Sequence, residues 1–255
     1  MLKYRIVWTA VALCAIALAG CSTSTQAVKK KQSEAFRNLG EAYLAEGNYT
    51  TALRELLKAE RLNPKDPYLQ NDLGIAYRFK KLPDLAVVHF KRALEIKSDY
   101  TPALNNLGIA YLDRNEPEPA IACFKKVTGD ILYATPHYPL TNLGRAYFIK
   151  NDYQQALQYY REALDLQPDF INALRGLGQV YLAQGNLTEA LSIQQKAISI
   201  APKLAILYLD LGKTHTLARD YQKAREAFGR AVALDPGSAP AGQAAEALER
   251  IKDLN

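Results

Sequence analysis

The chain has 255 residues, of which 32 are basic and 26 acidic, and its formal net charge is +6. These charges are interspersed along the sequence, with no basic stripe and no motif that combines basic and aromatic residues. Their distribution argues against nucleic-acid binding.

The N-terminal segment differs in composition from the rest of the chain. Lys3 and Arg5 precede an apolar run, residues 6–19, which is too short to span a membrane comfortably. The run leads into the sequence Leu-Ala-Gly-Cys, ending at Cys21, which closely resembles a bacterial lipobox. The resemblance implies that residues 1–20 are a lipoprotein signal peptide and that Cys21 is the first mature residue, acylated on its thiol and its amino group. The alternative is an uncleaved anchor in which this cysteine is incidental.

Lipid on Cys21 would attach the protein to a membrane without a spanning helix, since each buried methylene contributes about 0.8 kcal/mol. Ser22 stands where an aspartate would resemble an inner-membrane retention signal, which favours the periplasmic face of the outer membrane. Residues 21–32 are small or polar, so we predict an acylated, flexible tether. Because Cys14 would leave with the signal peptide, Cys123 would be the remaining free thiol, and we expect no disulfide bond in the mature chain.

Beyond the tether, one pattern occurs six times: Leu-Gly, followed three residues later by Tyr or His. Successive glycines of this pattern are 34, 34, 36, 34 and 34 residues apart. A period of 34 with this signature is that of the tetratricopeptide repeat, a helix–turn–helix unit. We therefore predict an all-α, superhelical solenoid of six repeats. With the glycine as position 8, the repeats are residues 33–66, 67–100, 101–136, 137–170, 171–204 and 205–238.

The glycine in the first helix of each repeat needs a structural cause, because glycine in a helix is about 1 kcal/mol less favourable than alanine. Position 20 is alanine in all six repeats, so we expect the glycine of helix A to face this alanine of helix B. The side chain at position 24 is expected to pack against the next repeat. The position-24 residues are Leu56, Phe90, Phe124, Tyr160, Gln194 and Phe228.

The C-terminal segment, residues 239–255, follows the last repeat. Apolar residues recur in it at helical spacing, with charged residues between them. This pattern predicts an amphipathic helix that covers the open hydrophobic face of the last repeat.

Residues that carry catalytic or metal chemistry are sparse. The three histidines, His89, His137 and His215, lie in three different repeats, and we expect each to have a structural role. The sequence contains no His-Glu-x-x-His pair, Cys-x-x-Cys pair, phosphate-binding loop or nucleophile elbow. We therefore expect no enzymatic activity, metal, cofactor or small-molecule substrate.

Helix A of such repeats lines a concave groove, mainly through positions 2, 5, 6, 9, 12 and 13. Asparagine or aspartate recurs here at positions 5 and 6, and an amide side chain can pair with the backbone of an extended peptide. Apolar residues between them favour an interaction surface, whereas the alternative is that Asn-Leu-Gly aids helix packing. Positions 5 and 9 lack the Lys and Asn of chaperone-type carboxylate clamps, which disfavours a chaperone-tail receptor. The predicted groove residues are Asn38, Asn71, Asp72, Ile75, Phe79, Asn105, Asn106, Ile109, Leu112, Asn142, Arg145, Phe148 and Ile149.

The regular period breaks between Gly108 and Gly144, where two residues are added. The segment 128–136 lacks the proline found at position 32 in other repeats and carries apolar residues into a loop, where they need burial or a partner. We predict that this loop is a second candidate surface for a partner. Its residues are Asp130, Ile131, Leu132 and Tyr133.

Together, the lipobox, the six repeats and the lengthened junction resemble the type IV pilus biogenesis and stability lipoproteins. The most informative stretch runs from Asn105 to Gly144, because those proteins similarly place an acidic residue and Leu-Tyr in a lengthened junction between repeats three and four. The resemblance implies an outer-membrane lipoprotein that acts as pilotin for the pilus secretin, helping its subunits localise and assemble into a ring.

Two other functions stay open on the sequence. One is a periplasmic adaptor lipoprotein that tethers cell-wall hydrolases or proteases. The other is a scaffold of polysaccharide-export or protein-sorting machinery. Neighbouring genes would separate these functions, because pilin and secretin genes favour the first interpretation and wall-hydrolase genes favour the adaptor.

Overall fold

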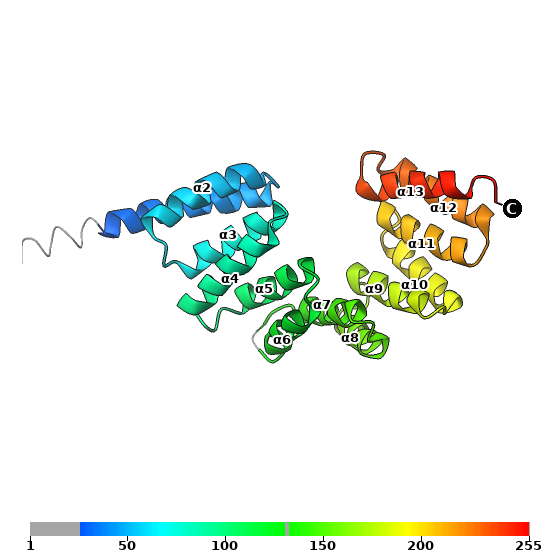
Figure 1. Ribbon diagram of the computed structural model, residues 1–255, viewed down its shortest axis with the longest axis horizontal. Coiled ribbons are helices and arrows are strands. Elements are labelled where there is room, and N and C mark those ends of the chain that lie inside the picture. The colour runs from blue at the N-terminus through cyan, green and yellow to red at the C-terminus, as the bar shows by residue number, and fades with distance from the viewer. Residues whose placement is uncertain (1–25, 131–132, 255) are drawn as a thin grey trace, which may run out of the picture. The chain divides into compact units, whose positions relative to one another are not determined.

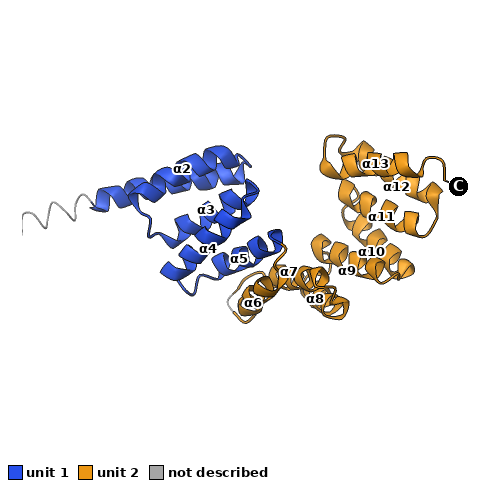
Figure 2. Cartoon of the chain, in the orientation of Figure 1, with its two compact units in different colours: residues 1–114 blue, residues 115–255 orange. Residues whose placement is uncertain are grey.

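The computed structural model describes residues 26–130 and 133–254, and these residues form helices joined by short turns, with no strand among them (Figure 1). The predicted signal peptide, Cys21, Ile131 and Leu132 lie outside the described residues. The chain divides into two compact units, Met1–Arg114 and Asn115–Asn255 (Figure 2). The predicted all-α, tetratricopeptide-type fold is confirmed.

The described part of unit 1 begins with helical residues 26–45, which are followed by four helices, the last of which is the first helix of repeat three. Its further helices are α2 (Tyr49–Leu62), α3 (Pro67–Phe79), α4 (Pro83–Ile96) and α5 (Thr101–Asp113).

Unit 2 continues the same alternation and ends in a single additional helix. Its helices are α6 (Pro117–Thr128), α7 (His137–Ile149), α8 (Tyr153–Leu166), α9 (Ile171–Ala183), α10 (Leu187–Ile200), α11 (Ala205–Leu217), α12 (Tyr221–Leu234) and α13 (Ala239–Ile251).

The predicted flexible tether differs from the structure, because residues 26–32 are helical and continue into the first helix of repeat one. Their sequence, Gln-Ala-Val-Lys-Lys-Lys-Gln, contains neither glycine nor proline and is rich in good helix formers. Extending an existing helix adds one hydrogen bond for each residue fixed, without the cost of a new nucleus. In the described structure, the three lysines are therefore held on a helix.

The position-8 glycine lies against the position-24 side chain, and the expected contact with the position-20 alanine is not the closest one. A Cβ atom added at Gly74 would lie 2.5 Å from the ring of Phe90, and one added at Gly212 would lie 2.5 Å from the ring of Phe228. Both rings are fully or almost fully buried. Glycine is thus required because an aromatic ring from helix B lies across the backbone of helix A.

Repeat five departs from this arrangement because its position-24 residue is Gln194. A Cβ atom added at Gly178 would meet the Cγ atom of Gln194 at 3.5 Å, an ordinary van der Waals distance. The Gln194 amide donates from Nε2 to Oγ1 of Thr214 at 2.8 Å, so it reaches the next repeat as the other position-24 residues were expected to do.

The C-terminal helix α13 packs on α11 and α12. Leu209 and Phe228 form one buried cluster with Ala244 and Ile251 of this helix. Residues 239–251 thus cover the last repeat, as the amphipathic pattern predicts. No helix in the described residues is both long enough and apolar enough to cross a membrane.

A candidate partner-binding pocket

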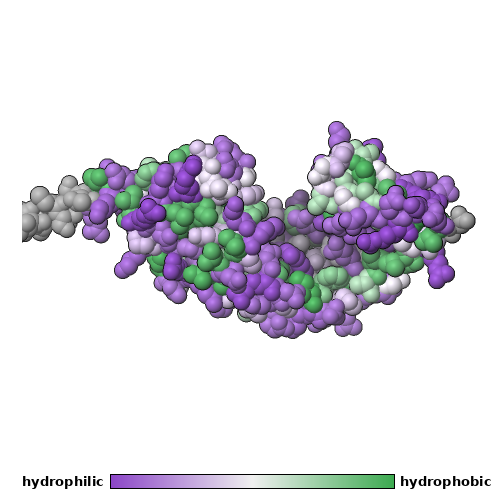
Figure 3. Space-filling model, turned by 45° about the horizontal axis from the view of Figure 1, so that its top comes forward, coloured by the Kyte–Doolittle hydropathy of each residue, from purple (hydrophilic) through white to green (hydrophobic). Residues whose placement is uncertain are grey.

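Hydropathy alone does not identify one functional surface. Apolar residues form several small patches separated by polar residues on the face that Figure 3 shows. No group of three or more His, Cys, Asp or Glu side chains within residues 26–130 and 133–254 could hold a metal ion. The candidate site therefore has to be located from side-chain geometry.

Unit 1 buries most of its predicted asparagine surface. Asn106 donates from Nδ2 to Oδ1 of Asn71 at 2.9 Å, and Asn71 donates in turn to Oδ1 of Asp72 at 3.4 Å. Asn71, Asp72, Asn105 and Leu112 are each at most 9% exposed. These four side chains are therefore not available to a partner, contrary to the groove prediction, because surrounding side chains bury them.

Asp72 lies in an unusual charge environment within unit 1. Arg37 is 3.1 Å from Asp66 and 3.2 Å from Glu41, but its Nε atom is 4.0 Å from Oδ2 of Asp72. Burial, together with the negative charge of Glu41, raises the pKa of Asp72 to about 8, and Arg37 only partly opposes this. Asp72 is thus harder to ionise than an exposed aspartate, and its place in the fold is structural.

The other predicted groove residues of unit 1 are more accessible. Asn38 is exposed, and Ile75 and Ile109 are half-buried. Phe79 is 43% exposed, and its ring stacks on that of Tyr49 with the ring centroids 4.5 Å apart. None of these four residues lines the pocket of unit 2 described below.

In unit 2, a polar pair again joins the first helices of two neighbouring repeats. Arg175 on α9, at position 5, donates from Nε to Oδ2 of Asp210 on α11, at position 6, at 2.8 Å. The equivalent positions on α7 and α9 are Thr141 and Gly176, so no such pair can form there, because glycine has no side chain. The ring of Tyr160 from α8 occupies the space: a Cβ atom at Gly176 would lie 2.2 Å from its Cζ atom.

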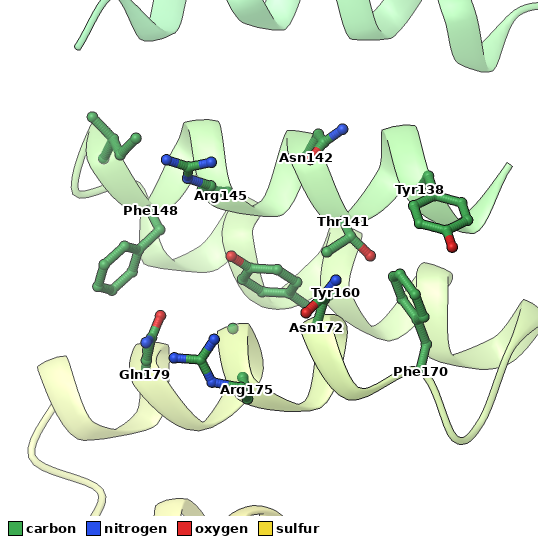
Figure 4. Close-up of a pocket in the computed structure, with 12 residues that line it drawn as sticks. Tyr138, Thr141, Asn142, Arg145, Phe148, Tyr160, Phe170, Asn172, Arg175 and Gln179 are labelled. Carbon is green, nitrogen blue, oxygen red and sulfur yellow. The ribbon is translucent and has the colours of Figure 1, made fainter. Parts of the chain in front are cut away.

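Two glycines make room for Tyr160. A Cβ atom at Gly144 would lie 2.8 Å from one side of the ring, and Gly176 borders its hydroxyl end. Figure 4 shows this hydroxyl end pointing into the space between Arg145 and Arg175. Burial raises the pKa of Tyr160, and the two arginines oppose this effect, so the hydroxyl group stays a proton donor at neutral pH.

The hydroxyl end of Tyr160 faces a pocket of about 540 Å³ that lies within unit 2. Aromatic side chains stand at both ends of this pocket, and arginine and amide side chains stand between them (Figure 4). Tyr138 and Phe170 form one end, with their ring centroids 4.9 Å apart. The lining residues are Tyr138, Thr141, Asn142, Arg145, Phe148, Ile149, Tyr160, Phe170, Asn172, Arg175, Gly176 and Gln179.

The predicted groove residues Asn142, Arg145, Phe148 and Ile149 all line this pocket. The sequence contains one signal for the other lining residues. At position 6, where the other repeats carry Asn or Asp, repeat five carries Gly176, and the preceding repeat is the one with tyrosine at position 24. The lining residues that the sequence interpretation missed are Tyr138, Thr141, Tyr160, Phe170, Asn172, Arg175, Gly176 and Gln179.

The predicted partner-binding loop is described only at Asp130 and Tyr133. The Tyr133 amide donates to the Asp130 carbonyl oxygen at 3.1 Å, and the Tyr133 side chain is half-buried. Neither residue lines the pocket. The role of this loop stays a prediction.

The three histidines have structural surroundings. Nδ1 of His89 is 2.7 Å from Oε1 of Gln70, and both residues are buried. The ring of His137 packs edge-on against that of Phe170, with the centroids 4.8 Å apart. Burial lowers the pKa of His215. These contacts are those of packing residues.

Four stretches of the chain match the tetratricopeptide repeat family: residues 29–78, 101–129, 141–205 and 205–238. The chain is 28% identical over 163 residues to the type IV pilus assembly protein PilF of Pseudomonas aeruginosa, which covers 61% of this chain and 65% of that protein. It is 35% identical over 74 residues to the mouse Superkiller complex protein 3, but this match spans only 5% of that protein.

Two similar solved structures are those of the type IV pilus proteins PilW and PilF. The crystal structure of PilW, a widely conserved type IV pilus biogenesis factor, has a TM-score of 0.74 and 26% sequence identity. It covers 82% of this chain and 96% of the PilW chain. The structure of Pseudomonas aeruginosa PilF has a TM-score of 0.66 over 86% of this chain and 99% of that chain, and at 20% identity it supports the fold alone.

Proposed function

This chain is a tetratricopeptide repeat protein related in structure to type IV pilus biogenesis factors, and from this premise we propose that it is a non-enzymatic scaffold for pilus biogenesis. Its partner in this proposal is the pilus secretin. The scaffold helps secretin subunits localise and assemble into the outer-membrane ring.

The observation that carries the proposal is the extent of the similarity to PilW, 82% of this chain and 96% of that one. The sequence match to PilF, 28% identity over 61% of this chain, agrees with it, whereas the match to the Superkiller complex protein covers 29% of this chain and 5% of that protein. Similarity over almost a whole chain supports a shared role better than similarity over about two repeats.

The proposal includes a lipid anchor at Cys21 on the periplasmic face of the outer membrane of a Gram-negative bacterium. The lipobox-like sequence supports this anchor. Because residues 26–32 are helical, only residues 21–25 separate the acylated residue from the helix, a span of at most about 18 Å. The first repeat would thus be held close to the membrane surface.

The anchor is tested by metabolic labelling with a clickable fatty acid. We expect the wild-type protein to be labelled and the Cys21→Ala variant to remain unlabelled at equal expression. Equal labelling of both proteins would refute the anchor, whereas it would leave the secretin role to its own test.

The secretin role is tested by deleting the gene in the source organism. We expect secretin protein to be present but mostly monomeric, and surface pili to be lost, because ring assembly lacks its scaffold. A plasmid copy of the wild-type gene should restore both. Heat-resistant secretin multimers at normal abundance in the deletion strain would overturn the proposal.

A further inference from the structure

We propose that the pocket lined by α7, α8 and α9 binds an extended protein segment in which an acidic side chain lies between aromatic or aliphatic side chains. The inference deepens the proposed function and rests on it only in that the partner is a protein. It names the chemistry that the partner segment must present.

The charge of the pocket favours an acidic side chain. Arg145 and Arg175 are its charged lining residues, and none of its lining residues is acidic. Arg175 donates from Nε to Asp210, and the two terminal nitrogens of its guanidinium group can donate to a ligand. With the Tyr160 hydroxyl pointing between the two arginines (Figure 4), the middle of the pocket presents converging donors to a carboxylate.

The amide side chains favour a segment whose backbone is unpaired. Asn142, Asn172 and Gln179 line the pocket, and each amide can both donate and accept a hydrogen bond. An extended segment offers its backbone N–H and C=O groups to such side chains. A helical segment has already used those groups internally, and a small anion has no backbone to offer.

The two ends of the pocket favour apolar neighbours of the acidic residue. Tyr138 and Phe170 form one end, and Phe148 borders the other (Figure 4). Ile149, which also lines the pocket, follows Phe148 in the sequence. Tyr138 and Ile149 are eleven residues apart on α7, which corresponds to about 17 Å of helix. In an extended chain, the residues two positions on either side of the acidic one are about 13 Å apart. Aromatic or aliphatic side chains at these positions cover the remaining distance to both ends of the pocket.

The test uses a fluorescein-labelled peptide with the central sequence Phe-Ser-Asp-Ser-Phe, which reads the same in both chain directions. Fluorescence anisotropy measures its binding to the full chain purified in detergent. Two matched peptides replace the Asp by Asn or both Phe by Ala. We expect each replacement to weaken binding at least tenfold, because a charge-assisted hydrogen bond or the buried rings are lost.

Arg145 is the protein-side test because it is an exposed residue whose replacement should leave the fold intact. We expect Arg145→Gln to weaken binding of the Asp peptide at least tenfold and to leave binding of the Asn peptide unchanged. Arg145→Lys should retain part of the affinity. The matched control is Arg230→Gln, an exposed arginine outside the pocket, which should bind like wild type.

Several results would overturn the inference. They are equal binding of the Asp and Asn peptides, an equal loss in the Arg145 and Arg230 variants, or no binding at 1 mM peptide, about the weakest affinity worth assigning. Displacement of the peptide by inorganic phosphate at equal concentration would assign the pocket to small anions. The two proposals can fail separately. If the peptide binds specifically but a deletion strain keeps its secretin multimers, the pilus role alone is refuted. If the multimers are lost but the peptide does not bind, this pocket chemistry alone is refuted.

Discussion

A polar pair joins the first helices of neighbouring repeats between α3 and α5 in unit 1 and between α9 and α11 in unit 2, but not between α7 and α9. In unit 1, positions 5 and 6 carry Asn71 and Asn106, which are bonded to each other at 2.9 Å across two repeats. In unit 2, the same positions on α7 and α9 carry Thr141 and Gly176, and the Tyr160 ring stands between the helices. One arrangement closes the surface with a polar pair, and the other leaves a pocket of about 540 Å³.

This difference teaches that a repeat position does not have one role along a solenoid. At the junction of repeats four and five, the position-24 ring of Tyr160 occupies the space that a position-6 side chain in place of Gly176 would need. A leucine at position 24 in repeat one is followed by Asp72, whereas Tyr160 is followed by Gly176. The larger, polar ring displaces the side chain and supplies its own hydroxyl group instead.

The largest expected effect comes from restoring a position-6 side chain in unit 2. Gly176→Asn places a Cβ atom 2.2 Å from the buried Tyr160 ring, so we expect the free energy of unfolding to fall by about 3 kcal/mol. Adding Tyr160→Leu, the residue type of repeat one, should recover more than 1 kcal/mol of that loss. Urea denaturation of the wild-type protein, the two single variants and the double variant measures the coupling energy between the two positions. Strictly additive effects would show that the two positions do not compete.

The next effect concerns the charge environment of unit 1. The folded state raises the pKa of Asp72 from 3.8 to about 8, so between these values the folded protein keeps a proton that the unfolded chain releases. The contribution of Asp72 is therefore most favourable at low pH and is lost as the pH rises towards 8. We expect the stability contributed by this group to fall steadily between pH 5 and pH 8, by at most about 1.4 kcal/mol per pH unit.

The matched control for this pH dependence is Asp72→Asn, which has no proton to lose. The stability of the wild-type protein minus that of this variant should become more negative as the pH rises from 5 to 8, when both are unfolded in urea. Parallel profiles for the two proteins would mean that Asp72 is ionised in the folded state.

A smaller effect tests whether the asparagines of unit 1 are structural. Asn106→Ala removes the donor to Oδ1 of buried Asn71, and we expect a loss of about 1.5 kcal/mol. Asn38 is exposed and serves as the control, because Asn38→Ala should change stability by less than about 0.5 kcal/mol. If Asn106→Ala instead kept full stability and weakened partner binding tenfold, the asparagines would be the binding surface.

The smallest effect separates repeat five from the others. Gly178→Ala should stabilise the protein by about 0.5–1 kcal/mol, because the new Cβ atom meets Gln194 at 3.5 Å and alanine favours helix. Gly212→Ala should instead destabilise it, since the Phe228 ring is 2.5 Å from the added atom. Thermal unfolding curves compare the two, and the same sign of change in both variants would contradict the role assigned to position 24.

The sequence period predicts the fold class, because a 34-residue spacing reflects the repeating unit itself. It does not predict which side chain covers the glycine, because both position 20 and position 24 face helix A and only packing decides between them. The helical residues 26–32 were taken for a tether because their polar composition was weighed above their lack of helix breakers.

The candidate site was only partly predictable for a related reason. Position rules place Asn142 and Arg145 on the concave face, but the same rules place Asn71 and Asp72 there, and these two are buried. Exposure at a given position depends on the neighbouring repeat's side chain. The exchange of Tyr160 and Gly176 therefore has to be considered as a pair, across two repeats.

The most direct test of this contrast is photo-crosslinking in living cells. The photoreactive residue p-benzoylphenylalanine replaces either Gln179, which lines the pocket of unit 2, or half-buried Ile109 on α5 of unit 1. We expect a protein adduct from the Gln179 position alone, mapped by mass spectrometry to a partner segment with an acidic residue between apolar ones. An adduct from the Ile109 position alone would contradict the central claim, because it would place the partner on the polar surface of unit 1.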